Sequence, residues 1–342
     1  MIHIYPPSFT DFSINGVVLM PSSCMLSMEI NGVWTIQLEN SLDERFQNIV
    51  ENAIISVPTP YGQARFRITG IDKSNTGISA TAVPVFLDAS NDTFIYDQRP
   101  TNRTGQQALD ILTANTKYTG HSDITTPNTA YYQMKNLIEC ISSDDDNSFL
   151  NRWGGEIRYH NYDIYINKRL GADNGARVEF GFNLSSVNES IDMINVVTSI
   201  VPVSYNGYTL PDGETVDSSN INKYPTKYIR KIEFNDIKLK EDAQENDEEN
   251  GVIVCETLEE LYSELRKAAA QKFQEGIDLP SITYQVDMVD LSRTQEYEKF
   301  KDLVKVNLGD TVYVKHRRLN IETKARIIAL EYDCITEKIN HL

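Results

Sequence analysis

The sequence contains few residues whose type and spacing could support catalysis. It has no H-E-x-x-H zinc motif, no G-x-S-x-G nucleophile elbow and no glycine-rich phosphate loop after a predicted strand. None of the histidines pairs with another at metal-ligand spacing. The five are His3, His121, His160, His316 and His341. We therefore assign no catalytic, cofactor-binding or metal-binding residue and expect no cofactor.

Two local patterns could form a functional site, one catalytic and one calcium-binding. Cys140 and His160 could meet as a thiol nucleophile and its base, but a helical cysteine without a local signature is more often part of a core. The acidic run at residues 144–148 could begin a calcium loop. An EF-hand needs glycine at its sixth position and glutamate at its twelfth, where this chain has Phe149 and Gly155. We predict a solvated turn there. Paired carboxylates of a glycan hydrolase stay an open alternative, because only the tertiary structure sets their separation.

Composition limits the class of protein. A chain of 342 residues predicts two to four domains. The net charge of -17 disfavours specific nucleic-acid binding, which uses Lys and Arg contacts to phosphate, and suits a conduit that DNA passes without sticking. Ordinary solubility explains the same charge. The first residues are not typical of a signal peptide, and no apolar run has the length of a membrane span.

Cysteine usage predicts synthesis in a reducing compartment. The four cysteines are widely spaced and form no C-x-x-C pair, which argues against a zinc ribbon or a disulfide scaffold. They are Cys24, Cys140, Cys255 and Cys334.

Short strands dominate both ends of the chain. Asn-Gly pairs predict hairpins over residues 12–19 and 28–36, and alternation predicts strands over 63–68 and 78–83. A turn followed by a strand is expected over residues 46–57. Further strands are predicted over 191–206, 228–234, 282–289, 304–308, 311–314 and 324–333, with a turn at Gly309-Asp310. The basic cluster at residues 315–318 is placed in the hairpin between the last two, either as a surface turn or as a contact to an acidic neighbouring subunit.

Three helices are predicted between these strands. The first spans residues 103–112 with Thr104 as its N-cap, and the second spans 134–141. The clearest runs from Thr257 to Gly276, with Glu260 completing a capping box. Its apolar stripe comprises Leu258, Leu261, Leu265, Ala269 and Phe273. The charge block at residues 241–250 predicts an exposed loop or linker.

The stretch from residue 149 to 184 predicts a β-meander. Strands are expected over residues 156–159 and 162–167 around a turn at His160-Asn161, and a third begins at Val178. Two glycines, Gly171 and Gly175, lie in the loop before it. Tyrosines of this stretch and its surroundings are candidates for a receptor-binding patch, although aromatic residues in a meander more often serve packing. They are Tyr131, Tyr132, Tyr159, Tyr162 and Tyr165.

Several runs together carry a family resemblance. Three of them are WGGE at 153–156, RLGADNG at 169–175 and FGFNL at 180–184. The Asn-Gly-aromatic hairpin and the FRI strand near the N-terminus are further matching runs. LGDTVYV at 308–314 and ARIIALEYD at 325–333 complete the set. With these runs the chain resembles the prophage tail endopeptidase family, the tail-associated hub proteins of long-tailed phages, which are similar to the baseplate hub of contractile-tailed phages.

The resemblance implies an α+β, mostly β, multidomain tail-hub architecture with two small tube-like β-barrels. The first barrel is expected over residues 1–98, completed by about 191–206, with an inserted α+β domain over 99–190. The second barrel is expected over 207–250 and 280–342, with a helical insert over 251–279.

The same resemblance implies a structural role in a phage or prophage virion, made in the host bacterial cytoplasm. Three copies would form a pseudo-sixfold ring at the distal end of the tail tube, against distal tail, tail-tube or tape-measure proteins, and would form or close the channel for passing DNA. The family name raises an alternative, a tail-associated endopeptidase or cell-wall hydrolase. Lytic activity in related tail proteins tends to occupy a separate domain, so we expect a hub without one.

Overall fold

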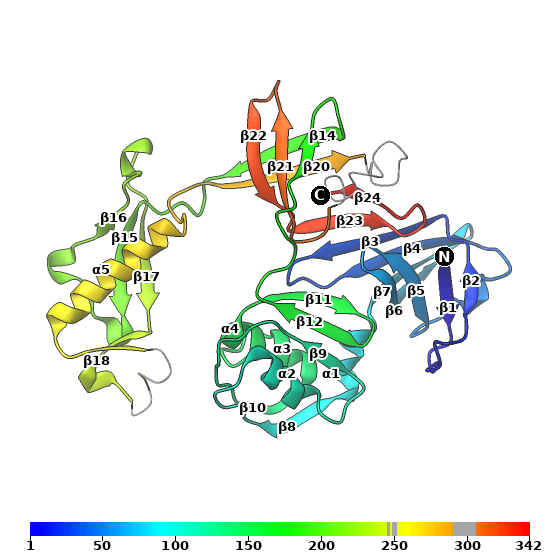
Figure 1. The fold of residues 1–342 in the computed structure, drawn as a ribbon, viewed down its shortest axis with the longest axis horizontal. Coiled ribbons are helices and arrows are strands. Elements are labelled where there is room, and N and C mark those ends of the chain that lie inside the picture. The colour runs from blue at the N-terminus through cyan, green and yellow to red at the C-terminus, as the bar shows by residue number, and fades with distance from the viewer. Residues whose placement is uncertain (245–246, 248–251, 290–305) are drawn as a thin grey trace. The chain divides into compact units, whose positions relative to one another are not determined.

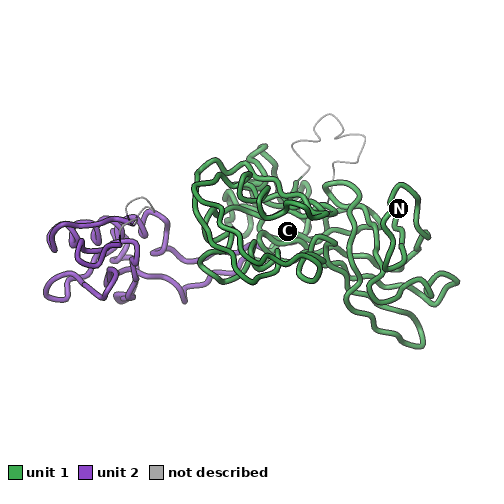
Figure 2. Tube along the Cα trace, turned by 90° about the horizontal axis from the view of Figure 1, so that it is seen from below, with its two compact units in different colours: residues 1–188, 285–342 green, residues 189–284 purple. Residues whose placement is uncertain are grey.

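The computed structural model describes residues 1–244, 247, 252–289 and 306–342 (Figure 1). The chain divides into two compact units (Figure 2). Unit 1 comprises residues 1–188 and 285–342, and unit 2 comprises residues 189–284. Over the described residues, no helix has both the length and the apolar character needed to cross a membrane.

An eleven-stranded sheet is the largest element of the fold. Its order is β14-β20-β24-β23-β3-β4-β7-β6-β5-β1-β2, and β14 and β20 are the two strands that continue into unit 2. The strands are β1 (Ile2–Tyr5), β2 (Val17–Leu19), β3 (Ser23–Glu29), β4 (Thr35–Ser41), β5 (Ile54–Thr59), β6 (Gly62–Lys73), β7 (Gly77–Pro84), β14 (Leu184–Asp192), β20 (Ser281–Met288), β23 (Ala329–Asp333) and β24 (Lys338–His341). Because β23 pairs antiparallel with β3, the first and last β regions share one sheet.

The β3–β4 hairpin confirms the second Asn-Gly prediction. Asn31 adopts φ 58°, a left-handed conformation that asparagine tolerates better than most residues. Its side chain also accepts from the Ile157 N–H at 2.9 Å and donates to the Gly155 carbonyl at 3.1 Å. The turn residue therefore fixes the hairpin and its contact with residues 155–157.

The first Asn-Gly prediction is wrong, since β2 pairs with β1 and not with residues 12–14. Phe9 and Phe12 pack edge-on with each other and against Tyr5, which holds the intervening loop against β1. A Cβ on Gly16 would lie 2.4 Å from the Ile4 carbonyl oxygen. Gly16 therefore permits a close backbone approach, and no hairpin turn forms there.

Helices and short strands make up the insert that follows β7. The predicted helix at 103–112 is α2 (Gly105–Thr113), and Thr104 caps it through a reciprocal box with Gln107. Residues 134–136 were predicted to start the second helix, but they are not helical. They belong to β10 (Tyr132–Asn136), and Asn136 then caps α3 (Leu137–Ser142) through a box with Glu139. The remaining elements of the insert are α1 (Ala89–Asp92), β8 (Phe94–Gln98), β9 (Thr119–His121) and α4 (Phe149–Trp153).

The expected meander forms only its first two strands. β11 (Glu156–His160) and β12 (Asp163–Asn167) pair antiparallel around Asn161, which adopts φ 56°. The other neighbour of β12 is β9, in parallel. β13 (Ala176–Glu179) instead pairs in parallel with β21 (Thr311–His316), which is antiparallel to β22 (Ile321–Arg326). The loop at residues 168–175 thus leads the chain away from the hairpin to a different sheet.

The single strand predicted over residues 324–333 is two strands in two sheets. β22 ends at Arg326 and β23 begins at Ala329. Between them the Ile327 carbonyl accepts from the Gly309 N–H at 2.8 Å, and the Ile327 N–H donates to the Asp310 backbone carbonyl at 2.9 Å. Of the strand expected over 304–308, residues 304 and 305 lie outside the described part, and residues 306–308 are not in a strand.

Unit 2 contains a three-stranded sheet, a two-stranded sheet and one long helix that packs against them. β15 (Ser199–Ser204) pairs with β16 (Val216–Asp217) and in parallel with β17 (Ile229–Phe234). β18 (Ile237–Leu239) pairs in parallel with β19 (Ile253–Cys255). β15 lies in the residues expected to complete the first barrel, and its pairing partners are inside unit 2. Residues 207–239, expected in the second barrel, also belong to unit 2.

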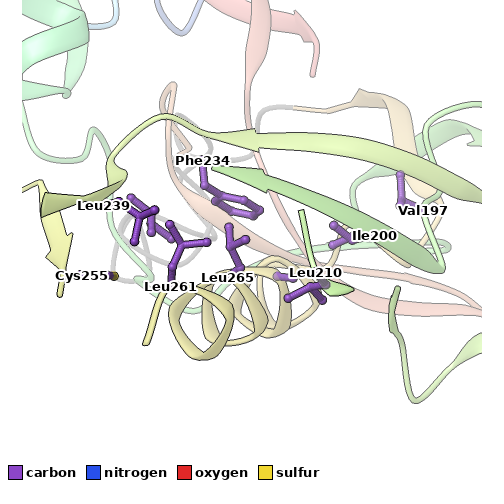
Figure 3. Close-up of a cluster of buried hydrophobic side chains, with 10 residues drawn as sticks. Val197, Ile200, Leu210, Phe234, Leu239, Cys255, Leu261 and Leu265 are labelled. Carbon is purple, nitrogen blue, oxygen red and sulfur yellow. The ribbon is translucent and has the colours of Figure 1, made fainter. Parts of the chain in front are cut away.

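Helix α5 (Leu258–Gln274) confirms the predicted helix, with Thr257 as N-cap. The Glu260 carboxylate accepts from the Glu256 N–H at 2.8 Å, one residue before the position that a capping box requires. Leu261 and Leu265 face Phe234 of β17 (Figure 3). The buried cluster comprises Val197, Ile200, Leu210, Phe234, Ile237, Leu239, Cys255, Leu261, Leu265 and Ala269. Leu258, expected in the stripe, is exposed.

The charge block at residues 241–250 is described only in part. Residues 240–242 form the short 3-10 helix η6 (Lys240–Asp242), and Asp247 is buried against the Lys238 ammonium at 2.9 Å. Lys238 lowers the pKa of Asp247. Asp247 therefore differs from the expected exposed loop, whereas Glu241 and Gln244 are exposed. Residues 245–246 and 248–250 of the block lie outside the described residues. The other 3-10 helices are η1 (Phe46–Asn48), η2 (Val85–Asp88), η3 (Tyr205–Gly207), η4 (Pro211–Gly213) and η5 (Ile221–Lys223).

Candidate assembly surface and its supporting junction

Cys140 is in an environment that suppresses thiolate chemistry. It is fully buried on α3, and that burial raises the pKa of its thiol to about 12. A catalytic cysteine needs the opposite shift, since the thiolate is the nucleophile. His160 ends β11, where burial first and the nearby Arg158 second lower its pKa. Cys140 therefore acts as a core residue.

The other histidines serve separate local contacts. His121 bonds the Asp163 carboxylate at 2.9 Å and stacks on Tyr165. His341 pairs with Asp287. Across residues 1–244, 247, 252–289 and 306–342, no group of three or more His, Cys, Asp or Glu side chains is arranged to hold a metal ion.

The acidic run at residues 144–148 supports a turn. Asp145 accepts from the Lys135 ammonium at 2.5 Å and from the Asn147 N–H at 2.7 Å. Ser148 then caps α4. The Lys135 contact and the Asn147 N–H lower the pKa of Asp145. The Asp145 carboxylate is therefore engaged in turn contacts, and the Ser148 side chain supplies the helix cap.

The five tyrosines considered as a receptor platform do not form one exposed patch. Tyr132 and Tyr159 are buried, and Tyr159 packs edge-on against Trp34. Tyr131 lies under the Arg99 guanidinium, while Tyr162 packs against Tyr118. Tyr165 stacks with His121. Packing explains most of this set.

Two loops with no sequence proximity interlock at what we call the junction, residues 169–172 with residues 309–311. A Cβ on Gly171 would lie 2.1 Å from the Gly309 carbonyl carbon. A Cβ on Gly309 would lie 2.5 Å from the Leu170 carbonyl oxygen. Both glycines have positive φ, 69° and 88°. Only glycine at both positions allows the two backbones to approach this closely.

Hydrogen bonds close the junction on both sides. The Asp310 carboxylate accepts from the Ala172 N–H at 2.7 Å, and the Thr311 N–H donates to the Ala172 carbonyl at 3.0 Å. Arg169 donates to the Thr311 hydroxyl at 2.8 Å. The loop at 169–172 thereby aligns β13 beside β21, which explains why the third strand leaves the meander.

A bidentate ion pair completes the junction. The Arg326 guanidinium donates to both carboxylate oxygens of Glu156, at 2.6 and 2.5 Å, and to the carbonyls of Leu170 and Gly309, each at 3.0 Å. Burial favours the neutral acid, but Arg326 and the Leu170 N–H outweigh it and lower the pKa of Glu156. Four of the runs that carry the family resemblance, WGGE, RLGADNG, LGDTVYV and ARIIALEYD, therefore meet at one place.

The opposite end of the β21–β22 hairpin carries exposed cations, as the sequence predicted for residues 315–318. Arg317 is 83% exposed at its side chain and reaches Glu179 only at 4.0 Å. Arg318 lies over the Phe180 ring at 5.5 Å, and His316 packs against the same ring at 4.4 Å. We call His316, Arg317, Arg318 and Phe180 the hairpin tip.

A groove of about 700 Å³ extends along the sheet β13-β21-β22 beside the tip. Its cations outnumber its carboxylates, although the whole chain is acidic. The charged side chains that line it are Arg177, Lys315, Arg317, Lys324, Asp173 and Glu179. Lys315 and Lys324 are paired with Glu322 and Asp173, at 2.8 and 3.0 Å. Groove and tip form a locally basic surface that suits an acidic protein partner.

The fold is shared with solved phage tail proteins along nearly the whole chain. The prophage tail protein gp18 of Listeria monocytogenes matches with TM-score 0.60 and 14% identity, covering 99% of this chain and 92% of that one. The 43 kDa tail protein of prophage MuSo2 of Shewanella oneidensis has TM-score 0.60 and 11% identity over 97% and 92%. A tail protein of Neisseria meningitidis has TM-score 0.56 and 8% identity over 99% and 94%.

The expected fold class is thereby confirmed, as a mostly β, α+β tail-protein fold. No curated protein matches the sequence. Residues 172–341 match the family model "Prophage endopeptidase tail", a segment that begins in the junction and includes the hairpin tip and unit 2. By this match residues 172–341 belong to the prophage endopeptidase tail family.

Proposed function

We propose that this protein is a structural component of a phage or prophage tail tip, the hub at the distal end of the tail tube. The observation that carries the proposal is the family match combined with a tail-protein fold along nearly the entire chain. Two observations on the described residues give the hydrolase alternative no support: the Cys140 thiol is buried with a raised pKa, and no group of three or more His, Cys, Asp or Glu side chains is arranged to hold a metal ion.

The proposed hub assembles as a ring of three copies. Copies with a net charge of -17 repel one another unless opposite charges meet locally. The basic groove and hairpin tip provide one such local surface, and acidic faces of a neighbouring copy provide its complement. The distal tail protein and the tail-tube or tape-measure proteins are the proposed further neighbours. The acidic charge lets DNA pass without specific binding.

The pseudo-sixfold part of the expectation gains no support from strand order. The first β region is ordered β3-β4-β7-β6-β5-β1-β2, whereas the last contributes β20-β24-β23 to the same sheet and β21-β22 to another. The proposed ring therefore keeps three copies but not a sixfold arrangement of matching barrels. The proposed location is the virion, after synthesis in the host bacterial cytoplasm.

Light scattering after size exclusion, over a range of protein concentrations, tests the ring. A mass of three chains supports it. Immunogold labelling of particles with an antibody against this chain tests the location, with label at the distal tail end as the expected result. Label absent from the particles, together with clearing of host cell walls by the purified chain, would replace the structural role with the enzymatic one.

A further inference from the structure

Two buried cysteines from opposite ends of the chain lie directly opposite each other in the large sheet. β23 runs antiparallel to β3, with Asp333 opposite Met25. One step further along, the Cys334 N–H donates to the Cys24 carbonyl at 2.9 Å. Cys334 therefore occupies the position facing Cys24.

Both side chains point to the same, buried face of the sheet. Alternate residues of a strand share a face. On β3, Cys24 shares its face with the buried Leu26 and Met28. Cys334 directly follows β23, and by the same alternation it shares a face with Leu330 and Tyr332 of that strand. Cys24 is 0% exposed and Cys334 is 1% exposed.

This placement suits a covalent bond. Facing residues of an antiparallel pair have Cα atoms about 4.5–5.5 Å apart. Disulfides span Cα separations of about 4.4–6.8 Å. We propose that Cys24 and Cys334 form an intramolecular disulfide when the folded protein meets a disulfide oxidant.

The reaction is a thiol–disulfide exchange with two steps. One cysteine thiolate attacks a small disulfide such as oxidised glutathione, forming a mixed disulfide and releasing one glutathione thiolate. The second cysteine then attacks the mixed disulfide and releases the other glutathione. The protein loses two electrons and two protons, and the oxidant is reduced to two thiols.

Burial makes this exchange slow in the native state. The adjacent Cys24 first, and burial second, raise the pKa of the Cys334 thiol, so Cys334 is held as a thiol at neutral pH. Oxidation therefore proceeds through local opening of the β3–β23 pair. The bond would tie the first β region to the last. We expect the disulfide to form after the phage particle leaves the reducing cytoplasm of the host, and this timing rests on the proposed function.

The test is oxidation of the purified full-length protein with oxidised glutathione, in parallel with a sample kept in reductant. Intact mass measurement should show the loss of two hydrogen atoms. Mapping of peptides without reduction should recover residues around Cys24 joined to residues around Cys334. The midpoint of thermal unfolding should rise by about 5 °C or more, because the cross-link restricts the unfolded chain.

Cys140 provides a matched control, since it is equally buried but lies on α3. Cys140→Ala should keep the cross-link and the rise in unfolding temperature, whereas Cys24→Ala should lose both. Peptide mapping of the unsubstituted protein decides the matter even if a variant fails to fold. Four free thiols after prolonged oxidation and after refolding with oxidised glutathione would overturn the proposal, as would cross-links through Cys140 or Cys255.

Discussion

The two ends of the β21–β22 hairpin differ in how their polar groups are used. At one end, Arg326 makes two bonds to Glu156 and two to backbone carbonyls, and Asp310 holds the Ala172 N–H. At the other end, Arg317 is 83% exposed and its carboxylate partner is 4.0 Å away. At one end of the hairpin the polar groups are hydrogen-bonded within the protein, and at the other end the cations are exposed to solvent.

The difference separates stability from assembly. Charged hydrogen bonds that are shielded from water stabilise a fold by more than exposed ion pairs, which contribute about 0–1 kcal/mol. Substitutions at the junction should therefore act on folding, and substitutions at the tip should act on contacts with other molecules.

Gly171→Ala should have the largest effect on stability. Its new Cβ would overlap the Gly309 backbone, which cannot move aside without separating β13 from β21. We expect a loss of about 4 kcal/mol or more in the free energy of unfolding, or failure to fold. Urea unfolding followed by tryptophan fluorescence measures the loss.

Gly181→Ala is the matched control for this substitution. Gly181 has φ 87° but open space where its Cβ would lie. The left-handed conformation alone should cost about 1–2 kcal/mol. Equal losses for the two variants would show that the close approach at the junction contributes nothing.

Arg326→Met should destabilise the protein by about 3 kcal/mol, because it removes the cation paired with the half-buried Glu156 carboxylate and the Arg326 hydrogen bonds to two carbonyls. A double-mutant cycle with Glu156→Gln isolates the pair. A coupling free energy near zero would contradict the role assigned to this pair.

The Glu156–Arg326 pair should also make stability depend on pH in the acid range, with a smaller change in the free energy of unfolding than Arg326→Met causes. The pKa of Glu156 is lowered in the folded protein, so its contribution to stability is complete above the ordinary glutamate pKa of about 4.3 and is lost as the pH falls through the folded value. Urea unfolding from neutral pH to about pH 3 should show the difference between the original protein and Glu156→Gln shrinking below about pH 4.3. A constant difference across that range would exclude the linkage.

The double substitution Arg317→Glu and Arg318→Glu should change the free energy of unfolding least, by under about 0.5 kcal/mol. It should nevertheless shift assembled species toward single chains in light scattering, because it reverses the charge of the hairpin tip. Lys223→Glu with Arg230→Glu makes the same charge change on exposed residues of unit 2. Equal loss of assembly in both doubles would mean that net charge, and not the tip, controls association.

Local chemistry was predictable from the sequence wherever neighbouring residues decide the outcome. Thr104 and Thr257 cap their helices as expected, and Asn31 forms its hairpin turn. The Asn136-x-x-Glu139 box marks the true start of α3 and was available in the sequence, but the apolar pattern suggested an earlier start. Short-range patterns suffice here because the partners lie within a few residues.

Tertiary structure alone decided which strands pair and what the glycines are for. Gly171 meets Gly309, Glu156 meets Arg326, and both contacts join parts of the chain that alternation cannot relate. Strand periodicity gives the face of each residue but not its neighbouring strand. For the same reason the four cysteines, widely spaced in sequence, gave no sign that Cys24 and Cys334 face each other across β3 and β23.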